Sequence, residues 1–430
     1  MGVPSLPIVS IPHELFGLSD KQIEEAADKL IDEIVRVLTT PREKLIEEFR
    51  SKNNIEEVEQ KLSRPRVMPT QEKVKSRANA REATAAFYER GWTDGLPIIP
   101  PTEELVEEML QFTDRKRDET IVKLAPRWGK ATPEKIAVNA VMAGCLPEYM
   151  PVLVAAVEAL GDPQFNLFAL QATTNPVAPL LIVNGPVRNE LKVNYSFGAF
   201  GPGWQANATL GRAIRLMLVN IGGGMPGTTD KAIHGHPAKF TFCAGENEEE
   251  SPWEPLHVSR GLKKEVSAVT VVGVQAEHNF VVWDGTGESF LSVAANAMSA
   301  FATNNAFHAG TAVLVMNPGH AQIVSRLGYS RADVQKYMYD NAHIPLGSVP
   351  KEEVPHYQLR RPKFGWDVQD AFMSITDKPD DIMVVVIGAV GAHGQFLPTF
   401  GDPTIPVTRP IAFKDGTPAA SVYDFKNRKK

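Results

Sequence analysis

The chain has 430 residues, a net charge of −6, and ordinary shares of hydrophobic (43%) and charged (22%) residues. This composition is that of a globular protein, and the length is enough for two or three domains. No basic cluster is large enough to predict nucleic-acid binding, and no apolar run reaches the roughly 18 residues needed to cross a membrane. Two cysteines, and a start without a basic and apolar leader, predict a reduced, cytoplasmic protein.

The first 68 residues differ from the rest because they are rich in charge and carry one apolar face. Apolar residues at helical spacing predict a helix over 19–37, and Thr40-Pro41 is typical of the start of a second helix. Residues 63–70 have the composition of a linker. We therefore predict a helical N-terminal arm that docks on this chain or on a partner, and we expect a homo-oligomer.

From about residue 120 onward, short apolar strands alternate with helices, which is the pattern of an α/β protein. The stretch LLIVNGP (180–186) resembles VLVMNPG (313–319), and VNAVMAG (138–144) resembles AANAMSA (294–300). This internal similarity predicts an α/β fold of two similar lobes behind the helical arm. The predicted domains are residues 1–68 for the arm, 69–260 for the first lobe and 261–430 for the second lobe.

Three of the predicted strands end in loops that contain glycine or asparagine. In open α/β sheets, ligands bind beyond the carboxyl ends of the strands, where helix N-termini present backbone N–H groups that favour anions. We therefore expect a site there for a small, carboxylate-bearing substrate. The loops lack a G-x-G-x-x-G fingerprint and a phosphate-binding lysine motif, so NAD, FAD and ATP are not predicted. The expected substrate contacts are Asn184, Asn207, Arg212, Asn317 and Gly391.

Residues 220–250 combine three consecutive glycines, a His-x-His pair, a cysteine and four glutamates. Imidazole and thiolate groups suit zinc, iron, nickel or copper. We predict that His234, His236 and Cys243 hold such a metal, with Cys243 delivered by a short alternating strand over 239–242. The alternative is structural: a histidine that caps a turn, and a thiol that is buried as a small apolar group.

Further residues are predicted to take part in catalysis. Glu246 or Glu248 would act as a general base beside the metal, and Cys243 would carry any thiol redox chemistry. His320 lies in the first turn of a helix after a buried strand, where the helix N-terminus favours a neutral imidazole that donates a hydrogen bond. His393 follows a strand in a glycine-rich loop that a ligand can approach closely. For His320, a structural role at the helix start is the alternative.

Several segments resemble a family of bacterial proteins associated with small proteins that carry a Cys/selenocysteine-Gly-Ser-Cys motif. They are GWTDGLPIIPPT (91–102), HGHPAKFTFCAGENEEESPW (234–253) and LGYSRADVQKYMYDNAHIP (327–345). The opening segment, residues 4–39, resembles the tail of those small proteins. The resemblance implies that this chain is the large component of a two-part enzyme, and it assigns no catalytic residue. Because this chain has no Cys-Gly-Ser-Cys motif, that motif would come from the partner.

Three functions are open on the sequence alone. The first is a metal-assisted lyase or hydrolase that acts on a small anionic molecule. The second is a thiol-based oxidoreductase component that works with a partner of the Cys-Gly-Ser-Cys type. The third is a non-catalytic scaffold or binding subunit that docks through its arm. The crowded polar chemistry of residues 234–250 favours an enzyme over a scaffold.

Overall fold

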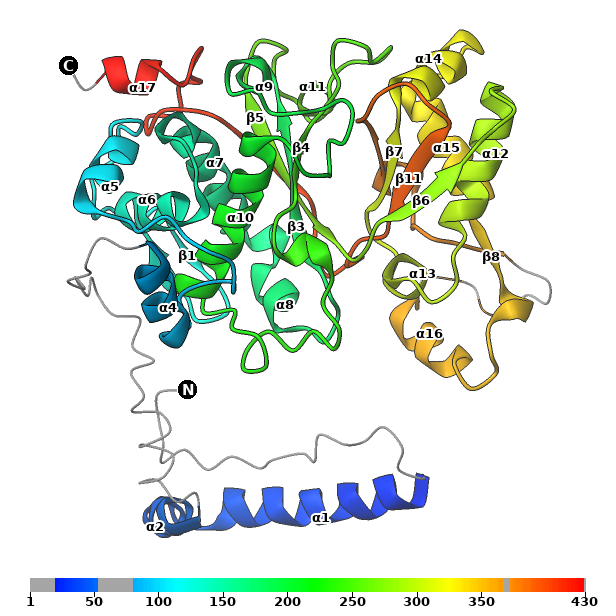
Figure 1. Ribbon diagram of the computed structural model, residues 1–430. Helices are drawn as coiled ribbons and strands as arrows, with labels where there is room; N and C mark the ends of the chain where they lie inside the picture. Colours follow the sequence, from blue (N-terminus) through cyan, green and yellow to red (C-terminus); the bar gives the residue numbers. More distant parts are fainter. Residues whose placement is uncertain (1–19, 53–79, 363, 365, 367–371, 429–430) are drawn as a thin grey trace. The chain divides into compact units, whose positions relative to one another are not determined.

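The computed structural model describes residues 20–52, 80–362, 364, 366 and 372–428. The chain divides into two compact units, Met1–Val74 and Lys75–Lys430. Helices and mixed β-sheets make up the second unit, so the predicted α/β class is confirmed (Figure 1). Every helix in the described ranges is too short or too polar to cross a bilayer.

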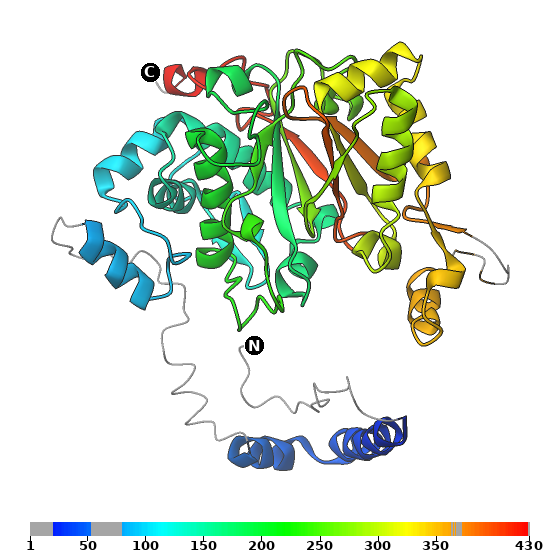
Figure 2. The ribbon, with the colours of Figure 1, turned by 45° about the vertical axis from the view of Figure 1, so that its right-hand side comes forward.

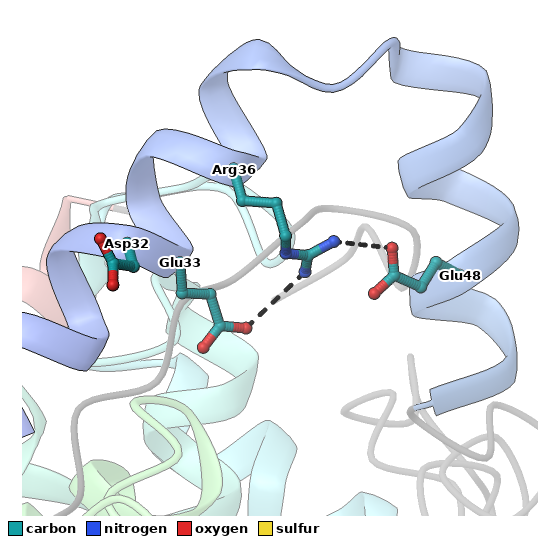
Figure 3. A pocket seen from close by; sticks show the side chains of 4 residues that line it. All are labelled: Asp32, Glu33, Arg36 and Glu48. Atoms are coloured by element: carbon teal, nitrogen blue, oxygen red, sulfur yellow. Dashed lines mark hydrogen bonds and ion pairs between the residues drawn. The ribbon is translucent and has the colours of Figure 1, made fainter.

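In the first unit, residues 20–52 form the helices α1 (Asp20–Thr39) and α2 (Arg42–Lys52), as expected for the arm. Arg36 of α1 lies 2.9 Å from Glu48 of α2 and 3.9 Å from Glu33, and these side chains line an open pocket together with Asp32 (Figure 3). Because these charges face solvent, they contribute little to stability. The Thr40 hydroxyl donates to the Arg36 carbonyl and so closes α1 rather than capping α2.

The first lobe is built on a four-stranded sheet in the order β12-β5-β3-β4. β3 and β4 run parallel, whereas β5 is antiparallel to both β3 and β12. The strands are β3 (Ala178–Asn184), β4 (Cys243–Gly245), β5 (Ala268–Val274) and β12 (Val407–Pro410). The hairpin strands are β1 (Val122–Leu124) and β2 (Gly129–Ala131), and the helices are α4 (Ala80–Glu89), α5 (Glu103–Leu110), α6 (Pro133–Ala143), α7 (Met150–Leu160), α8 (Leu167–Ala172), α9 (Val187–Glu190), α10 (Gln205–Asn220), α11 (Leu256–Ser259) and α17 (Asp424–Asn427).

The second lobe has a sheet of the same size in the order β10-β7-β11-β6. β7 and β10 run parallel, and β11 is antiparallel to both β7 and β6. The strands are β6 (His278–Val281), β7 (Ala312–Met316), β10 (Ile382–Val386) and β11 (His393–Leu397). A separate two-stranded antiparallel sheet is formed by β8 (His343–Pro345) and β9 (Phe372–Ser374). The helices are α12 (Gly287–Met298), α13 (Asn304–His308), α14 (Pro318–Arg326), α15 (Arg331–Asn341) and α16 (Val354–Arg360).

The two sheets share one topology, and they exchange their edge strands. In each, a central strand has a parallel neighbour on one side and an antiparallel neighbour on the other, with an asparagine as the last residue of β3 and directly after β7. β5 of the first sheet leads into β6 of the second, and β11 of the second leads into β12 of the first. The sheets therefore do not follow the predicted division at residue 261. Hydrophobic periodicity identifies a strand but not the sheet that it joins.

One apolar core joins the lobes. Leu180 and Ile182 of the first sheet lie in the same buried cluster as Val313 and Val385 of the second. Backbone bonds link the strand ends as well, because Asn247, just after β4, donates to the Val386 carbonyl at 2.8 Å. Figure 2 shows the strands of both sheets between the flanking helices. The carboxyl ends of both parallel pairs consequently meet at one end of the molecule's second unit.

Gly211 offers a test of how tightly α10 packs on the segment that leads into β4. A Cβ at this position would lie 2.4 Å from the Phe242 amide nitrogen and 2.5 Å from the Thr241 hydroxyl. Alanine is otherwise about 1 kcal/mol better than glycine inside a helix. We expect Gly211→Ala to lower the free energy of unfolding by about 1–3 kcal/mol, because the backbone before β4 must move. Chemical denaturation measures this, and a stabilised variant would contradict the close packing.

Candidate functional site

Polar residues gather in two clusters beyond the carboxyl ends of the parallel strands. The first cluster follows β3 and β4 and contains Asn184, Glu246 and Glu248. The second follows β7 and the start of β11 and contains Asn317, His320 and His393. They differ in access to solvent, since Glu246 is fully buried whereas His393 is exposed.

Glu246 links the two lobes. One carboxylate oxygen accepts hydrogen bonds from Asn184 Nδ2 at 2.6 Å and from the Leu256 amide at 2.7 Å, and the other lies 3.5 Å from the Arg331 guanidinium of the second lobe. Burial raises the pKa of Glu246, and the positive charge of Arg331 opposes that rise. A carboxyl group with no exposed surface, held by both lobes, is placed to join them rather than to receive a proton from a ligand.

Glu248 and Glu249 are held by the same network. Glu248 accepts from Asn184 Nδ2 at 2.9 Å and from the Gly185 amide at 2.7 Å, and it lies 3.1 Å from Arg188 Nε. Glu249 forms a bidentate ion pair with Arg188, with nitrogen–oxygen distances of 3.0 and 3.1 Å. These charge-assisted bonds fix the loop after β4. The general base predicted at Glu246 or Glu248 gains no support from this geometry.

Asn317 organises the second cluster. Its Oδ1 accepts the backbone N–H of His320 at 3.0 Å, as the N-cap of α14. Its Nδ2 lies 2.7 Å from His320 Nδ1, 2.9 Å from the Gly391 carbonyl and 2.7 Å from the His393 carbonyl. One backbone donor and two carbonyl acceptors fix the orientation of the amide. The two Nδ2 hydrogens are shared among three acceptors, and because an amide nitrogen accepts no hydrogen bond, this contact fits His320 Nδ1 as an acceptor, with the proton of the neutral ring on Nε2.

The two histidines of this cluster have different surroundings. The His320 ring is 4% exposed and lies 4.5 Å from the Phe290 ring, centroid to centroid. Burial, together with the nearby positive charge of His393, lowers the pKa of His320 to about 4. His393 is exposed at the start of β11, and its Nδ1 lies 3.0 Å from Asn279 Nδ2 on β6. The second cluster thus combines a buried imidazole whose pKa is lowered with one that is exposed to solvent.

Two of the predicted substrate contacts are structural. Asn207 is buried, accepts the Asn194 amide at 2.7 Å and donates to three backbone carbonyls, including that of Cys243 at 3.2 Å. Arg212 forms a bidentate ion pair with Asp94: Nε and Nη2 lie 2.8 and 2.9 Å from the two carboxylate oxygens. This pair holds the loop before α5 in place. Asn184 belongs to the first cluster. Of the five predicted substrate contacts, Asn317 and Gly391 lie next to His320 and His393.

The predicted metal ligands do not form a group. Cys243 is buried and free, and burial raises the pKa of its thiol, which disfavours the thiolate. His234 is exposed and His236 is half-buried. Within the part of the chain that the structure describes, no three His, Cys, Asp or Glu side chains are grouped so that they would hold a metal. A metal at His234, His236 and Cys243 stays a prediction.

The segment before Cys243 differs from the strand predicted over 239–242. Pro237–Lys239 forms a short 3-10 turn, closed by the Phe240 amide that donates to the Pro237 carbonyl at 2.9 Å. The Thr241 hydroxyl donates to the Ala208 carbonyl of α10 at 2.8 Å. The strand begins only at Cys243 because Pro237 starts a turn and Thr241 bonds to the helix.

Both clusters also contain residues that were not predicted from the sequence. Arg188 and Arg331 hold the carboxylates of the first cluster, and Asn279 contacts His393 in the second. Asn279 lies on β6, an edge strand that was not predicted. The aromatic and β-branched run of residues 280–283 is a weak strand signal in the sequence that could have found it. The two arginines carry no local signal, because their partners are distant in sequence.

The chain matches no model of a known protein family, and no curated protein is similar to it in sequence. Function is therefore inferred from the residues of the two clusters.

The burial of His320 predicts a pH dependence of stability. The folded chain keeps this ring neutral down to about pH 4, whereas a histidine in an unfolded chain takes up a proton near pH 6.5. The stability that His320 contributes is complete above pH 6.5 and is lost as the pH falls toward 4. We expect His320→Gln to reduce this loss, by on the order of 2 kcal/mol, in denaturation curves at several pH values.

The control is His278→Gln, which removes an exposed histidine of β6. An equal loss of stability with falling pH in the wild type and in His320→Gln would show that the folded chain does not hold this ring neutral.

Proposed function

We propose that the chain is an enzyme that moves a proton on a small organic substrate, in a lyase or hydrolase reaction, at the pair His320 and His393. The observation that carries this proposal is the amide of Asn317, which contacts the ring of the buried His320 and the backbone carbonyl of the exposed His393. Two titratable groups whose surroundings differ in this way are typical of an acid–base site.

Each histidine has a separate role in this proposal. His393 is exposed, so it exchanges protons with solvent and serves as the general acid or base. His320 stays neutral and presents an Nε2–H, which stabilises negative charge that develops on a substrate oxygen. Asn317 is a positioning residue, because it fixes the tautomer of His320 and the backbone of His393.

A small carboxylate-bearing substrate fits this end of the lobes. The N-terminus of α14 begins at Asn317 and carries partial positive charge. Gly388 and Gly391 border open space, since a Cβ at either position would meet no atom within 4 Å. A ligand can therefore approach this loop closely.

Thiol redox chemistry, a docking partner and a cytoplasmic location are further proposals. Cys145 and Cys243 are both buried, and burial raises the pKa of both thiols, so thiol redox chemistry at Cys243 gains no support. A homo-oligomer, or a small partner of the Cys-Gly-Ser-Cys type, would dock through the arm. The exposed apolar side chains of α1, among them Ile31 and Leu38, support that idea. A cytoplasmic location agrees with two free thiols.

The test begins with a panel of small mono- and dicarboxylates, hydroxy acids and their amides, added to the full-length protein. Proton NMR of each compound detects turnover, and the histidine signals of the protein detect binding. We expect a compound that shifts the His393 signals to be converted. His393→Gln should lower its kcat/KM by about 100-fold or more.

The matched control is again His278→Gln, an exposed histidine on the neighbouring strand, which should retain kcat/KM. A substrate that His393→Gln converts as fast as the wild type would contradict the proposed role.

A further inference from the structure

A second set of polar side chains lies before β4, away from the histidine pair. Arg215 of α10 and His236 each have a buried nitrogen with no hydrogen-bond partner, Nη2 in the first and Nε2 in the second. Lys239 connects them: its carbonyl accepts from Arg215 Nε at 2.7 Å, and its amide donates to the His236 carbonyl at 2.9 Å. In both views the segment after α10 lies at the end of the first lobe opposite to α9 and α11 (Figures 1 and 2).

The charges of this set do not balance. Lys239 Nζ lies 2.9 and 2.7 Å from the two carboxylate oxygens of Asp230, which neutralise it. Arg215 reaches the same carboxylate only at 3.9 Å. The other acid that interacts with Arg215 is Asp94. Both carboxylate oxygens of Asp94 already accept hydrogen bonds from the Arg212 guanidinium. Three cations thus face two anions, and one positive charge is left over.

The excess charge is buried. Arg215 is 8% exposed, and burial lowers its pKa despite the two acids nearby. A buried guanidinium without a full counter-charge is unfavourable, and so is a buried N–H group without an acceptor. A bound anion would supply the missing counter-charge and an acceptor for Arg215 Nη2, and the effect of the Arg215 charge on the pKa of His236 indicates that the second unpartnered nitrogen, His236 Nε2, lies near.

We propose that Arg215 and His236, both bonded to the backbone of Lys239, form a binding site for a small carboxylate at the amino end of β4. One excess positive charge matches the single charge of a carboxylate, and the planar guanidinium matches its two oxygens. The site does not depend on the reaction proposed at His320 and His393. It gives a role to the His-x-His segment that the histidine pair leaves unexplained, with His236 facing inward and His234 exposed.

The experiment titrates the full-length protein with acetate, malonate, inorganic phosphate and chloride at constant ionic strength. EDTA is present throughout, so that no bound metal mediates the effect. Calorimetry measures the affinity, and the imidazole signals of His236, assigned with His236→Gln, report the place of binding. We expect saturable binding of acetate or malonate that shifts the His236 signals.

Three variants locate the site. Arg215→Gln and His236→Gln should each weaken carboxylate binding by about tenfold or more, because each removes one donor. His278→Gln, which removes an exposed histidine of β6, should bind like the wild type. Circular dichroism checks that each variant is folded, and His236→Gln decides the test if Arg215→Gln is not.

Absence of saturable carboxylate binding to the wild type would overturn the proposal. So would equal affinity in the wild type and in His236→Gln. Binding of phosphate without binding of either carboxylate would overturn the assignment of the ligand class.

Discussion

The carboxamide of Asn317 holds together the part of the molecule where we place the chemistry. Its oxygen accepts a hydrogen bond from the backbone of α14. Its nitrogen contacts the ring of His320 and two backbone carbonyls at the start of β11. These partners come from segments more than 70 residues apart in sequence. A single side chain therefore sets where the helix begins, which nitrogen of His320 carries the proton, and how close His393 lies.

The exchange of edge strands explains why such a site can form at the junction of two lobes. β6 follows β5 of the first sheet along the chain but completes the second sheet, and β12 follows β11 of the second sheet but completes the first. These strands connect the two sheets, which also share one core. Equivalent positions have diverged in chemistry. Asn184 ends β3 as Asn317 follows β7, but Asn184 holds two glutamates that fix the junction, whereas Asn317 holds two histidines. The first strand end is tied into the junction of the lobes, whereas the second is bonded to the backbone of the exposed His393.

Much of this organisation could be predicted from the sequence because it is local. Apolar runs and the paired motifs LLIVNGP and VLVMNPG predicted the α/β class and two similar halves, and the place of His320 and His393 after strands predicted that they lie at one edge. The carboxylates and arginines were harder to interpret. Arg212 pairs with Asp94, 118 residues away, so the sequence shows an arginine suited to a substrate carboxylate but not the partner that occupies it.

Burial was the second quantity that local patterns did not reveal. Cys243 and Glu246 lie in a segment rich in glycine and acids that is typical of an exposed reactive loop. In the fold, β4 carries this segment into the junction between the lobes, where both side chains lose contact with solvent. The same residues that indicated a reactive centre therefore became part of the structural frame. His393, in contrast, is exposed at the start of β11.

The central claim is that His320 is a neutral donor held in one tautomer beside an exposed His393. Long-range proton–nitrogen NMR correlation of the imidazole rings at pH 7.5 tests it most directly, with His320→Gln and His393→Gln used to assign the signals. The structure predicts a neutral His320 ring protonated on Nε2, because Asn317 donates to Nδ1. A ring protonated on Nδ1, or one protonated on both nitrogens, would contradict the proposed site.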